Sequence, residues 1–193
     1  MLIVGLTGPK GSGKDTVADL IVANYQAQWK TVHRLAFADP IKKVIQHIFD
    51  LDPTNNDQYD QFKRTEISYH LPGYMAHAVP GRHVVREIGM LMRGYDEKQF
   101  NKYIEDQFAS AQFTSNHVFV ITDLRFDNEY TMLRRWGAKI VKVDRPGYHY
   151  DGHITERGFQ DELVDFTIHN KGSLNDLTNS VQDLIIALNK EKK

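Results

Sequence analysis

The residues best suited to chemistry follow a short apolar run, residues 2–7, near the start of the chain. Glycines there let backbone N–H groups converge on phosphate oxygens, and the helical pattern that follows brings the positive end of a helix dipole. Lys14 adds a mobile charge for the outer phosphates. The stretch predicts a P-loop that grips a nucleoside triphosphate, an ordinary tight turn being the alternative. The candidate ATP-binding residues are Gly8, Lys10, Gly11, Ser12, Gly13, Lys14, Asp15 and Thr16.

The residue after Lys14 departs from the usual P-loop pattern. A Ser or Thr normally stands there and its hydroxyl binds Mg²⁺, but this chain has Asp15 followed by Thr16. Either the Asp15 carboxylate meets the metal, directly or through water, or Thr16 takes its place. The other interpretation makes Asp15 a favourable acid in the first turn of a helix. Both residues are therefore candidate metal ligands.

Composition excludes several classes of protein. A chain of 193 residues fits one domain with a substantial core. Its formal net charge of −1 lacks the basic excess that long nucleic acids require, and the absence of cysteine excludes disulfides and thiolate metal sites. The opening apolar run is too short, and lacks the basic flank, for a signal peptide or a membrane span. We expect a cytoplasmic protein without a membrane partner.

Strand-like and helical patterns alternate along most of the chain. Apolar or alternating runs predict strands over 2–7, 31–38, 117–122, 139–143 and 164–168. Apolar residues at helical spacing predict helices over 14–28, 39–49, 84–92, 100–111, 126–136 and 174–188. This alternation predicts an α/β fold of the P-loop NTPase type, with a five-stranded parallel sheet between two layers of helices. Ligands then bind at the carboxyl ends of the strands.

A helix start at residue 39 and a long polar segment after it need separate description. Asp39 precedes Pro40, which predicts a helix start with Asp39 as the N-cap. Residues 50–80 are polar, rich in tyrosine and punctuated by proline and glycine, without a sustained period. Loops of that length are usually functional or disordered, and the aromatic content favours function, so we expect an insertion or mobile flap. With the helices after it, the insertion covers 50–113 of a single domain, 1–193.

An acid stands where the third predicted strand ends. Asp123 lies where a Walker B aspartate orders Mg²⁺ or its water, and capping of the next helix is the alternative role. Arg125 follows two residues later and could bind a phosphate through two hydrogen bonds, a solvated arginine being the alternative. With Lys14, these two residues are the candidate catalytic groups.

A second anionic group must be held near the γ-phosphate, which requires further cations. Arginines cluster in and after the insertion, and Lys42 occupies the first turn of a helix, where its charge opposes the dipole. Each arginine alone is more often a solvated surface residue, so the clustering carries the prediction. The candidate acceptor-binding residues are Lys10, Asp39, Lys42, Arg64, Arg82, Arg86 and Arg125.

Residues 145–160 form a polar stretch between the last two predicted strands. Arg145 and Arg157 suit a lid that closes over the phosphates and excludes water. His149 and His153 lack an acid or a third ligand in a matching pattern, so a zinc site is not predicted there.

Four motifs together resemble the deoxynucleoside monophosphate kinases of tailed bacteriophages, over almost the whole chain. In that family, as in the distantly similar animal phosphomevalonate kinases, Asp follows the P-loop lysine, so Asp15 supports the resemblance. Only the P-loop is specific by itself, and the other motifs count through their order. The motifs are Gly8-Pro-Lys10-Gly-Ser-Gly13-Lys14-Asp15-Thr16, Phe37-Ala38-Asp39-Pro40-Ile41-Lys42, Arg82-His-Val-Val-Arg86-Glu87 and Thr122-Asp123-Leu124-Arg125-Phe126-Asp127-Asn128-Glu129.

The resemblance implies transfer of the γ-phosphoryl group of Mg²⁺-ATP to a deoxynucleoside monophosphate, in the cytoplasm of an infected host cell. It implies Mg²⁺ held by Asp15, Thr16 or Asp123, and it leaves a homodimer open. Three competitors remain: a kinase for phosphomevalonate or dephospho-coenzyme A, a P-loop binding module that transfers no phosphate, and a polynucleotide-end kinase, which the neutral charge disfavours.

Overall fold

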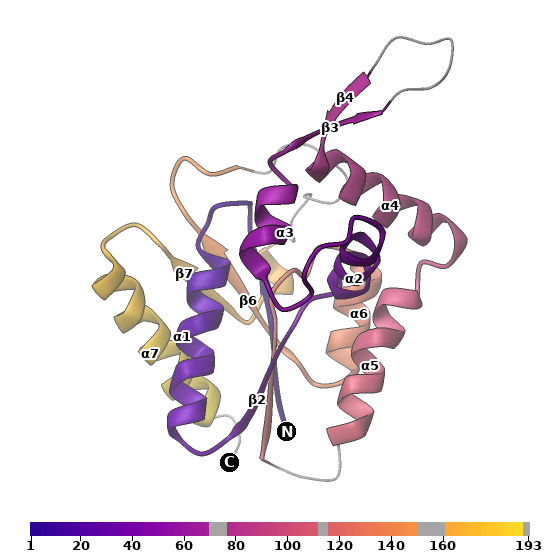
Figure 1. Ribbon diagram of the computed structural model, residues 1–193. Coiled ribbons are helices and arrows are strands. Elements are labelled where there is room, and N and C mark those ends of the chain that lie inside the picture. Colours follow the sequence, from indigo (N-terminus) through magenta and orange to yellow (C-terminus); the bar gives the residue numbers. More distant parts are fainter. Residues whose placement is uncertain (70–76, 112–115, 150–160, 191–193) are drawn as a thin grey trace. The chain divides into compact units, whose positions relative to one another are not determined.

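The computed structural model describes residues 1–69, 77–111, 116–149 and 161–190. The chain forms two compact units (Figure 1). The first contains Met1–Phe37 and Ile104–Lys193, and the second contains Ala38–Tyr103. The predicted P-loop therefore belongs to the first unit. The second unit includes most of the predicted insertion, 50–113, whose bounds stay a prediction.

The first unit is built on a sheet of five parallel strands in the order β2-β5-β1-β6-β7. All six residues of β1 are buried, as expected of an uninterrupted apolar run in a central strand. The predicted five-stranded parallel sheet is confirmed. Its strands are β1 (Leu2–Thr7), β2 (Thr31–Leu35), β5 (His117–Ile121), β6 (Lys139–Asp144) and β7 (Phe166–His169).

Helices cover both faces of this sheet (Figure 1). They are α1 (Lys14–Ala27), α6 (Asp127–Arg135), α7 (Leu174–Lys190) and the last part of α5 (Gln99–Ala111). On one face, Val4 of β1 shares a buried cluster with Ile21 of α1 and Val181 of α7. On the other face, a Cβ at Gly5 would lie 2.9 Å from Leu133 Cδ1, so glycine lets α6 approach the sheet closely. The unit is therefore the predicted three-layer α/β/α arrangement.

The carboxyl ends of β1, β2 and β5 are tied together beyond the regular ladder. Leu124 N donates to Leu6 O at 3.2 Å and Thr122 N donates to Leu35 O at 3.0 Å. The predicted strand 31–38 ends early, at Leu35, because Phe37 N donates to a side chain, Asp123, instead of continuing the ladder. These contacts hold the strand ends that carry the candidate site residues.

The second unit consists of helices and one hairpin. They are α2 (Asp39–Ile48), α3 (Asn56–Phe62), β3 (Glu66–Tyr69), β4 (His77–Pro80), α4 (Gly81–Tyr95) and the start of α5. The strands β3 and β4 pair antiparallel, with Ile67 opposite Val79. Helices α2 and α4 pack closely, because a Cβ at Gly89 would lie 2.9 Å from Ile41 Cδ1.

One prediction for this unit was wrong. Asp39 is not an N-cap, since α2 begins at Asp39 and its N-cap is Ala38. The described part of 50–80 also contains α3, β3 and β4, which were not predicted; α3 shows no period because only Tyr59 and Phe62 of its seven residues are buried. An insertion or mobile flap over this segment stays a prediction. No described helix is both long and apolar enough to cross a membrane.

Two histidines meet on neighbouring strands of the first unit. His33 Nε2 of β2 lies 2.8 Å from His117 Nδ1 of β5, a hydrogen bond in which one ring must donate and the other accept. The His33 ring also stacks on Phe119, with 4.5 Å between centroids. Desolvation, together with the charge of His117, lowers the pKa of His33 below its ordinary value.

This pair makes stability depend on pH. Because the unfolded chain binds a proton at His33 more readily than the folded chain, the free energy of unfolding should fall as the pH drops from about 7.5 to about 5.5. Thermal unfolding followed by circular dichroism at both pH values measures this loss. His33→Gln should reduce the loss, whereas the same change at the exposed His47 should not. Equal losses in all three proteins would contradict the assignment.

Candidate functional site

The loop between β1 and α1 has a backbone that requires its glycines. Gly8, Gly11 and Gly13 adopt φ values of 144°, 81° and 101°, a region that side chains disfavour. A Cβ at Gly8 would lie 2.3 Å from the carbonyl oxygen of Val143, at the end of β6. A Cβ at Gly13 would lie 2.6 Å from Asn170 Nδ2, just after β7. The loop is therefore fitted against two neighbouring strand ends.

Lys14 folds back across this loop. Its ammonium donates to Gly8 O and to Pro9 O, both at 2.7 Å. The first backbone bond of α1 runs from Val17 N to Gly13 O at 2.9 Å, so the N–H groups of the first turn have no acceptor within the helix. The Lys14 ammonium and the N–H groups of a helix start thus belong to the same stretch of chain, an arrangement suited to polyphosphate.

Ser12 carries an orphaned buried hydroxyl in the same loop. The residue is fully buried, and its Oγ has no hydrogen-bond partner among the described residues. Its carbonyl oxygen accepts a hydrogen bond from Asn170 Nδ2 at 2.9 Å. Buried hydroxyls rarely stay unpaired, so the loop fits a polar ligand that the protein itself does not supply.

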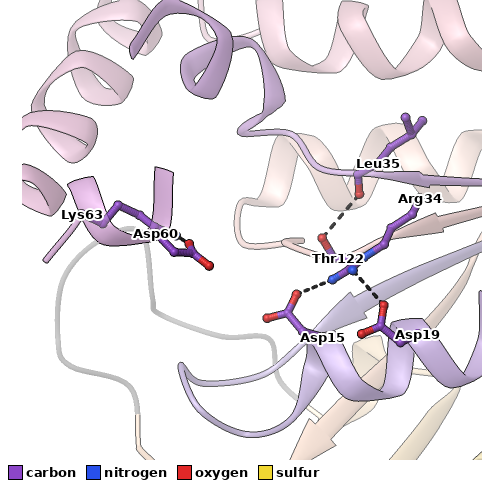
Figure 2. Close-up of polar contacts among 7 residues, drawn as sticks. All are labelled: Asp15, Asp19, Arg34, Leu35, Asp60, Lys63 and Thr122. Atoms are coloured by element: carbon purple, nitrogen blue, oxygen red, sulfur yellow. Dashed lines mark hydrogen bonds and ion pairs between the residues drawn. The ribbon is translucent and has the colours of Figure 1, made fainter. Parts of the chain in front are cut away.

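Asp15 is an exposed acid in the first turn of α1. Its Oδ1 lies 2.6 Å from Arg34 Nη2 of β2, and 84% of its side chain is accessible (Figure 2). Thr16 follows half-buried, and its hydroxyl has no hydrogen-bond partner among the described residues. Asp15 does lie in the first turn of α1, where an acid is favoured by the helix dipole. It also forms an ion pair with Arg34.

Asp123 lies just after β5 and accepts a hydrogen bond from Phe37 N at its Oδ1, at 2.7 Å. It does not cap the next helix, since the N-cap of α6 is Phe126, so that alternative was wrong. The acid that serves the start of α6 is Glu129. This buried residue accepts from Arg125 N at 2.9 Å and from Phe126 N at 3.1 Å.

Glu129 was not predicted as a site residue, although it lies in one of the four motifs. An acid three residues after an N-cap is the signal that could have identified its role. By holding two consecutive N–H groups, Glu129 fixes the turn that carries Asp123 and the half-buried Arg125.

The candidate metal ligands form a set of oxygen donors. A carboxylate of Asp15, the hydroxyl of Thr16 and a carboxylate of Asp123 are hard ligands, which suit Mg²⁺ and not zinc. In the described part of the chain, no group of three or more His, Cys, Asp or Glu residues could hold a metal ion by itself. The donor set therefore fits an ion that takes most of its ligands from phosphates and water.

Arg145 contacts the P-loop directly. Its Nη1 donates to Gly11 O at 3.3 Å, and its guanidinium lies 4.8 Å from the ring centroid of Tyr148. The Tyr148 ring also packs on the loop, because a Cβ at Gly11 would lie 2.5 Å from it. Arg157 and most of the predicted lid, 145–160, lie outside the described residues, as does His153.

Five candidate acceptor residues belong to the second unit and are considered within it. Lys42 Nζ donates to Asn56 Oδ1 and lies 5.4 Å from the ring centroid of Tyr59. Burial raises the pKa of Tyr59 to about 12, with smaller contributions from Asp60 and Asp39. Burial also raises the pKa of Tyr103, whose side chain is hydrogen-bonded to Asp39. Asp39 and Lys42 thus lie one turn apart on α2, among aromatic side chains.

The remaining cations of this unit differ in exposure. Arg82 and Arg86 lie one turn apart near the start of α4 and are half-buried, whereas Arg64 is exposed after α3. Arg82 N donates to Lys63 O at 3.1 Å, which ties the start of α4 to the end of α3. In the first unit, Lys10 is exposed on the P-loop.

Three comparisons bear on this arrangement. A family model described as deoxynucleotide monophosphate kinase matches residues 84–181. The deoxynucleotide monophosphate kinase of Enterobacteria phage T4 is 25% identical over 248 aligned positions, covering 97% of this chain and 100% of that protein. A protein of Acanthamoeba polyphaga mimivirus assigned the same activity is 27% identical over 161 residues, 78% of each chain.

A solved structure supports the fold. Dephospho-CoA kinase from Campylobacter jejuni matches with a TM-score of 0.52 and 15% identity, covering 99% of this chain and 98% of that one. The likeness extends to the fold alone at this level of identity. The family model, by contrast, spans half of the chain and includes the turn after β5 with Asp123 and Arg125. The motif resemblance is thereby confirmed, and this chain belongs to the deoxynucleotide monophosphate kinase family.

Proposed function

We propose that this protein transfers the γ-phosphoryl group of ATP to a deoxynucleoside 5′-monophosphate, giving ADP and the deoxynucleoside diphosphate. The observation that carries the proposal is the phosphate-binding geometry of Gly8–Lys14 in a chain of this family. In the reaction an oxygen of the acceptor phosphate attacks the γ-phosphorus, and the bond from the γ-phosphorus to the β–γ bridging oxygen breaks. The attacking oxygen is already anionic near neutral pH, so positioning and charge neutralisation can suffice without a protein base.

On the donor side, Lys14 would exchange its two loop carbonyls for the outer phosphate oxygens. The N–H groups of the first turn of α1 and the buried hydroxyl of Ser12 add further donors. Arg145 lies beside Gly11 O and could follow the phosphates when they bind. These groups neutralise charge where it accumulates as ADP leaves.

Mg²⁺ is the proposed cofactor, held through Asp15, Thr16 or Asp123. When bound, the ion supplies charge neutralisation on the phosphates. Asp123 offers a carboxylate whose Oδ1 is fixed by Phe37 N, and Asp15 offers one whose Oδ1 is fixed by Arg34. Each acid therefore has one carboxylate oxygen engaged by the protein.

On the acceptor side, the proposed ligands of the nucleotide are Arg125 and cations of the second unit. Lys42 is held by Asn56 against Tyr59, and Arg82 and Arg86 share one side of the start of α4. Arginine suits this task because its planar fork can hold a phosphate through two hydrogen bonds. Asp39, Arg64 and Lys10 remain proposed contributors. A homodimer, the absence of nucleic-acid and membrane partners, and action in the cytoplasm of an infected cell remain predictions.

The direct test is a panel of acceptors with Mg²⁺-ATP, measured by coupled release of ADP. The panel contains the four deoxynucleoside monophosphates, phosphomevalonate, dephospho-coenzyme A and an oligonucleotide with a 5′-hydroxyl. We expect turnover with at least one deoxynucleoside monophosphate and none with the other acceptors, since the family match does not favour those kinases. If no deoxynucleoside monophosphate were phosphorylated, the proposal would be wrong.

Lys14→Met should remove phosphoryl transfer while leaving the fold intact. The change keeps the apolar stem but deletes the ammonium, so kcat should fall about 100-fold or more. The Tm should stay within a few degrees of the wild type, because the side-chain hydrogen bonds that are lost to Gly8 O and Pro9 O lie within one loop. Lys30→Met, just before β2, is the matched control and should keep full activity. Comparable turnover in folded Lys14→Met would refute the role.

Asp123 has a structural contact and a proposed catalytic role, and two substitutions separate them. Asp123→Asn keeps an oxygen for Phe37 N but loses the charge, so it should lower kcat with little change in unfolding. Asp123→Ala also leaves the N–H of buried Phe37 without its acceptor, which should cost about 1–3 kcal/mol in urea unfolding. If Asp123→Asn were fully active, the carboxylate would serve only to join β5 to the end of β2.

A further inference from the structure

Arg34 of β2 forms a forked ion pair with two acids of α1. Its Nη2 lies 2.6 Å from Asp15 Oδ1, and its Nη1 lies 2.8 Å from Asp19 Oδ1. The two acids are four residues apart, one turn along the same face of the helix, so one planar guanidinium reaches both. Figure 2 shows Arg34 between Asp15 and Asp19, with Thr122, just after β5, joined to Leu35.

This network is too exposed to serve mainly the stability of the fold. Accessible fractions are 40% for the side chain of Arg34, 84% for Asp15 and 64% for Asp19. Ion pairs between such exposed groups contribute little to the free energy of unfolding, because water screens the charges and long side chains lose freedom. The network matters instead because Arg34 contacts the Asp15 carboxylate and offsets its negative charge.

Asp15 poses an electrostatic problem at the P-loop. A carboxylate in place of the usual hydroxyl adds negative charge at the helix start, where the polyphosphate would bind. Arg34 supplies the opposite charge from a neighbouring strand, and it engages only Oδ1 of Asp15. Among the described residues, the contacts of Asp15 involve Oδ1 alone, so Oδ2 is the oxygen left for an outside ligand.

We infer that Arg34 is a positioning residue, which orients Asp15 toward the magnesium ion of the bound nucleotide and offsets its charge. The inference rests on the proposed function, since it takes the Mg²⁺-nucleotide as the ligand of the P-loop. Residues that orient a metal ligand through a hydrogen bond typically change metal affinity by about 10–100-fold when they are removed. In this proposal Arg34 acts through Asp15 and not through contact with the nucleotide.

The test measures binding of ADP to the full chain by calorimetry over a series of Mg²⁺ concentrations. Arg34→Gln should raise the Mg²⁺ concentration for half-maximal binding about tenfold, with the Tm within a few degrees of the wild type. Arg34→Lys should recover part of the loss, because one ammonium can pair with Asp15 but cannot fork. Asp19→Asn is the matched control, and it should leave the Mg²⁺ dependence within about twofold, because it loses the other arm of the fork alone.

A double variant tests whether Arg34 acts through Asp15. In an Asp15→Asn background, Arg34→Gln should have no further effect on the Mg²⁺ dependence, because the carboxylate it orients is gone. An equal loss in that background would overturn the inference and assign Arg34 to the nucleotide directly. An unchanged Mg²⁺ dependence in Arg34→Gln, or an equal shift in Asp19→Asn, would also overturn it.

The two proposals fail separately. Binding of ADP needs no acceptor, so the Arg34 effect can be present even if the wild-type protein phosphorylates no deoxynucleotide. Conversely, the wild-type protein could phosphorylate deoxynucleotides while Arg34→Gln binds Mg²⁺-ADP normally. That result would contradict only the inference about Arg34.

Discussion

The close approach of the loop after β1 to the end of β6 is the constraint on which the donor site depends. Because the Val143 carbonyl would lie 2.3 Å from a Cβ at Gly8, the loop can pass that point only without a side chain. That passage turns the backbone so that α1 starts beside the carboxyl edge of the sheet. The N–H groups of its first turn, which have no acceptor within the helix, then belong to the same stretch of chain as the ammonium of Lys14. Packing of the sheet therefore creates the charge distribution of the site.

A site for polyphosphate must offset negative charge without filling with fixed cations. Lys14 and Arg145 are held by groups that can release them, whereas Arg34 is held in an ion pair. Lys14 is held by two carbonyl oxygens, Arg145 by one carbonyl and an aromatic ring, and Arg34 by two acids. Carbonyl partners can be exchanged for phosphate at little cost, whereas an ion pair keeps its cation in place. This difference separates cations suited to ligand binding from a cation suited to orientation.

Much of the first unit could be predicted because its signals are local. Apolar or alternating runs predicted the five strands of the sheet, and the glycine spacing predicted the loop, since both depend on neighbours in sequence. Contacts between distant residues could not be predicted: Arg145, a predicted lid residue, reaches Gly11, and Asn170, which was not a predicted site residue, reaches Ser12, each across more than a hundred positions. The sequence alone favours a solvated side chain for a single arginine in a strand, such as Arg34. Only the fold shows that Arg34 contacts acids of α1. In the second unit, α3 escaped prediction because two buried residues cannot establish a period.

Three acids near the carboxyl edge show how the protein assigns different tasks to similar side chains. Glu129 is buried and accepts two backbone N–H groups with one oxygen, so its charge is committed to the turn after β5. Asp123 is half-buried and gives one oxygen to Phe37 N, while Asp15 is exposed and gives one oxygen to Arg34. From Glu129 to Asp123 to Asp15 the carboxylate is more exposed and therefore easier to hydrate. A hydrated carboxylate can bind a metal ion that keeps its own waters with a smaller desolvation cost. Position within the sheet edge, more than residue type, thus decides which acid stabilises the backbone and which can serve the ligand.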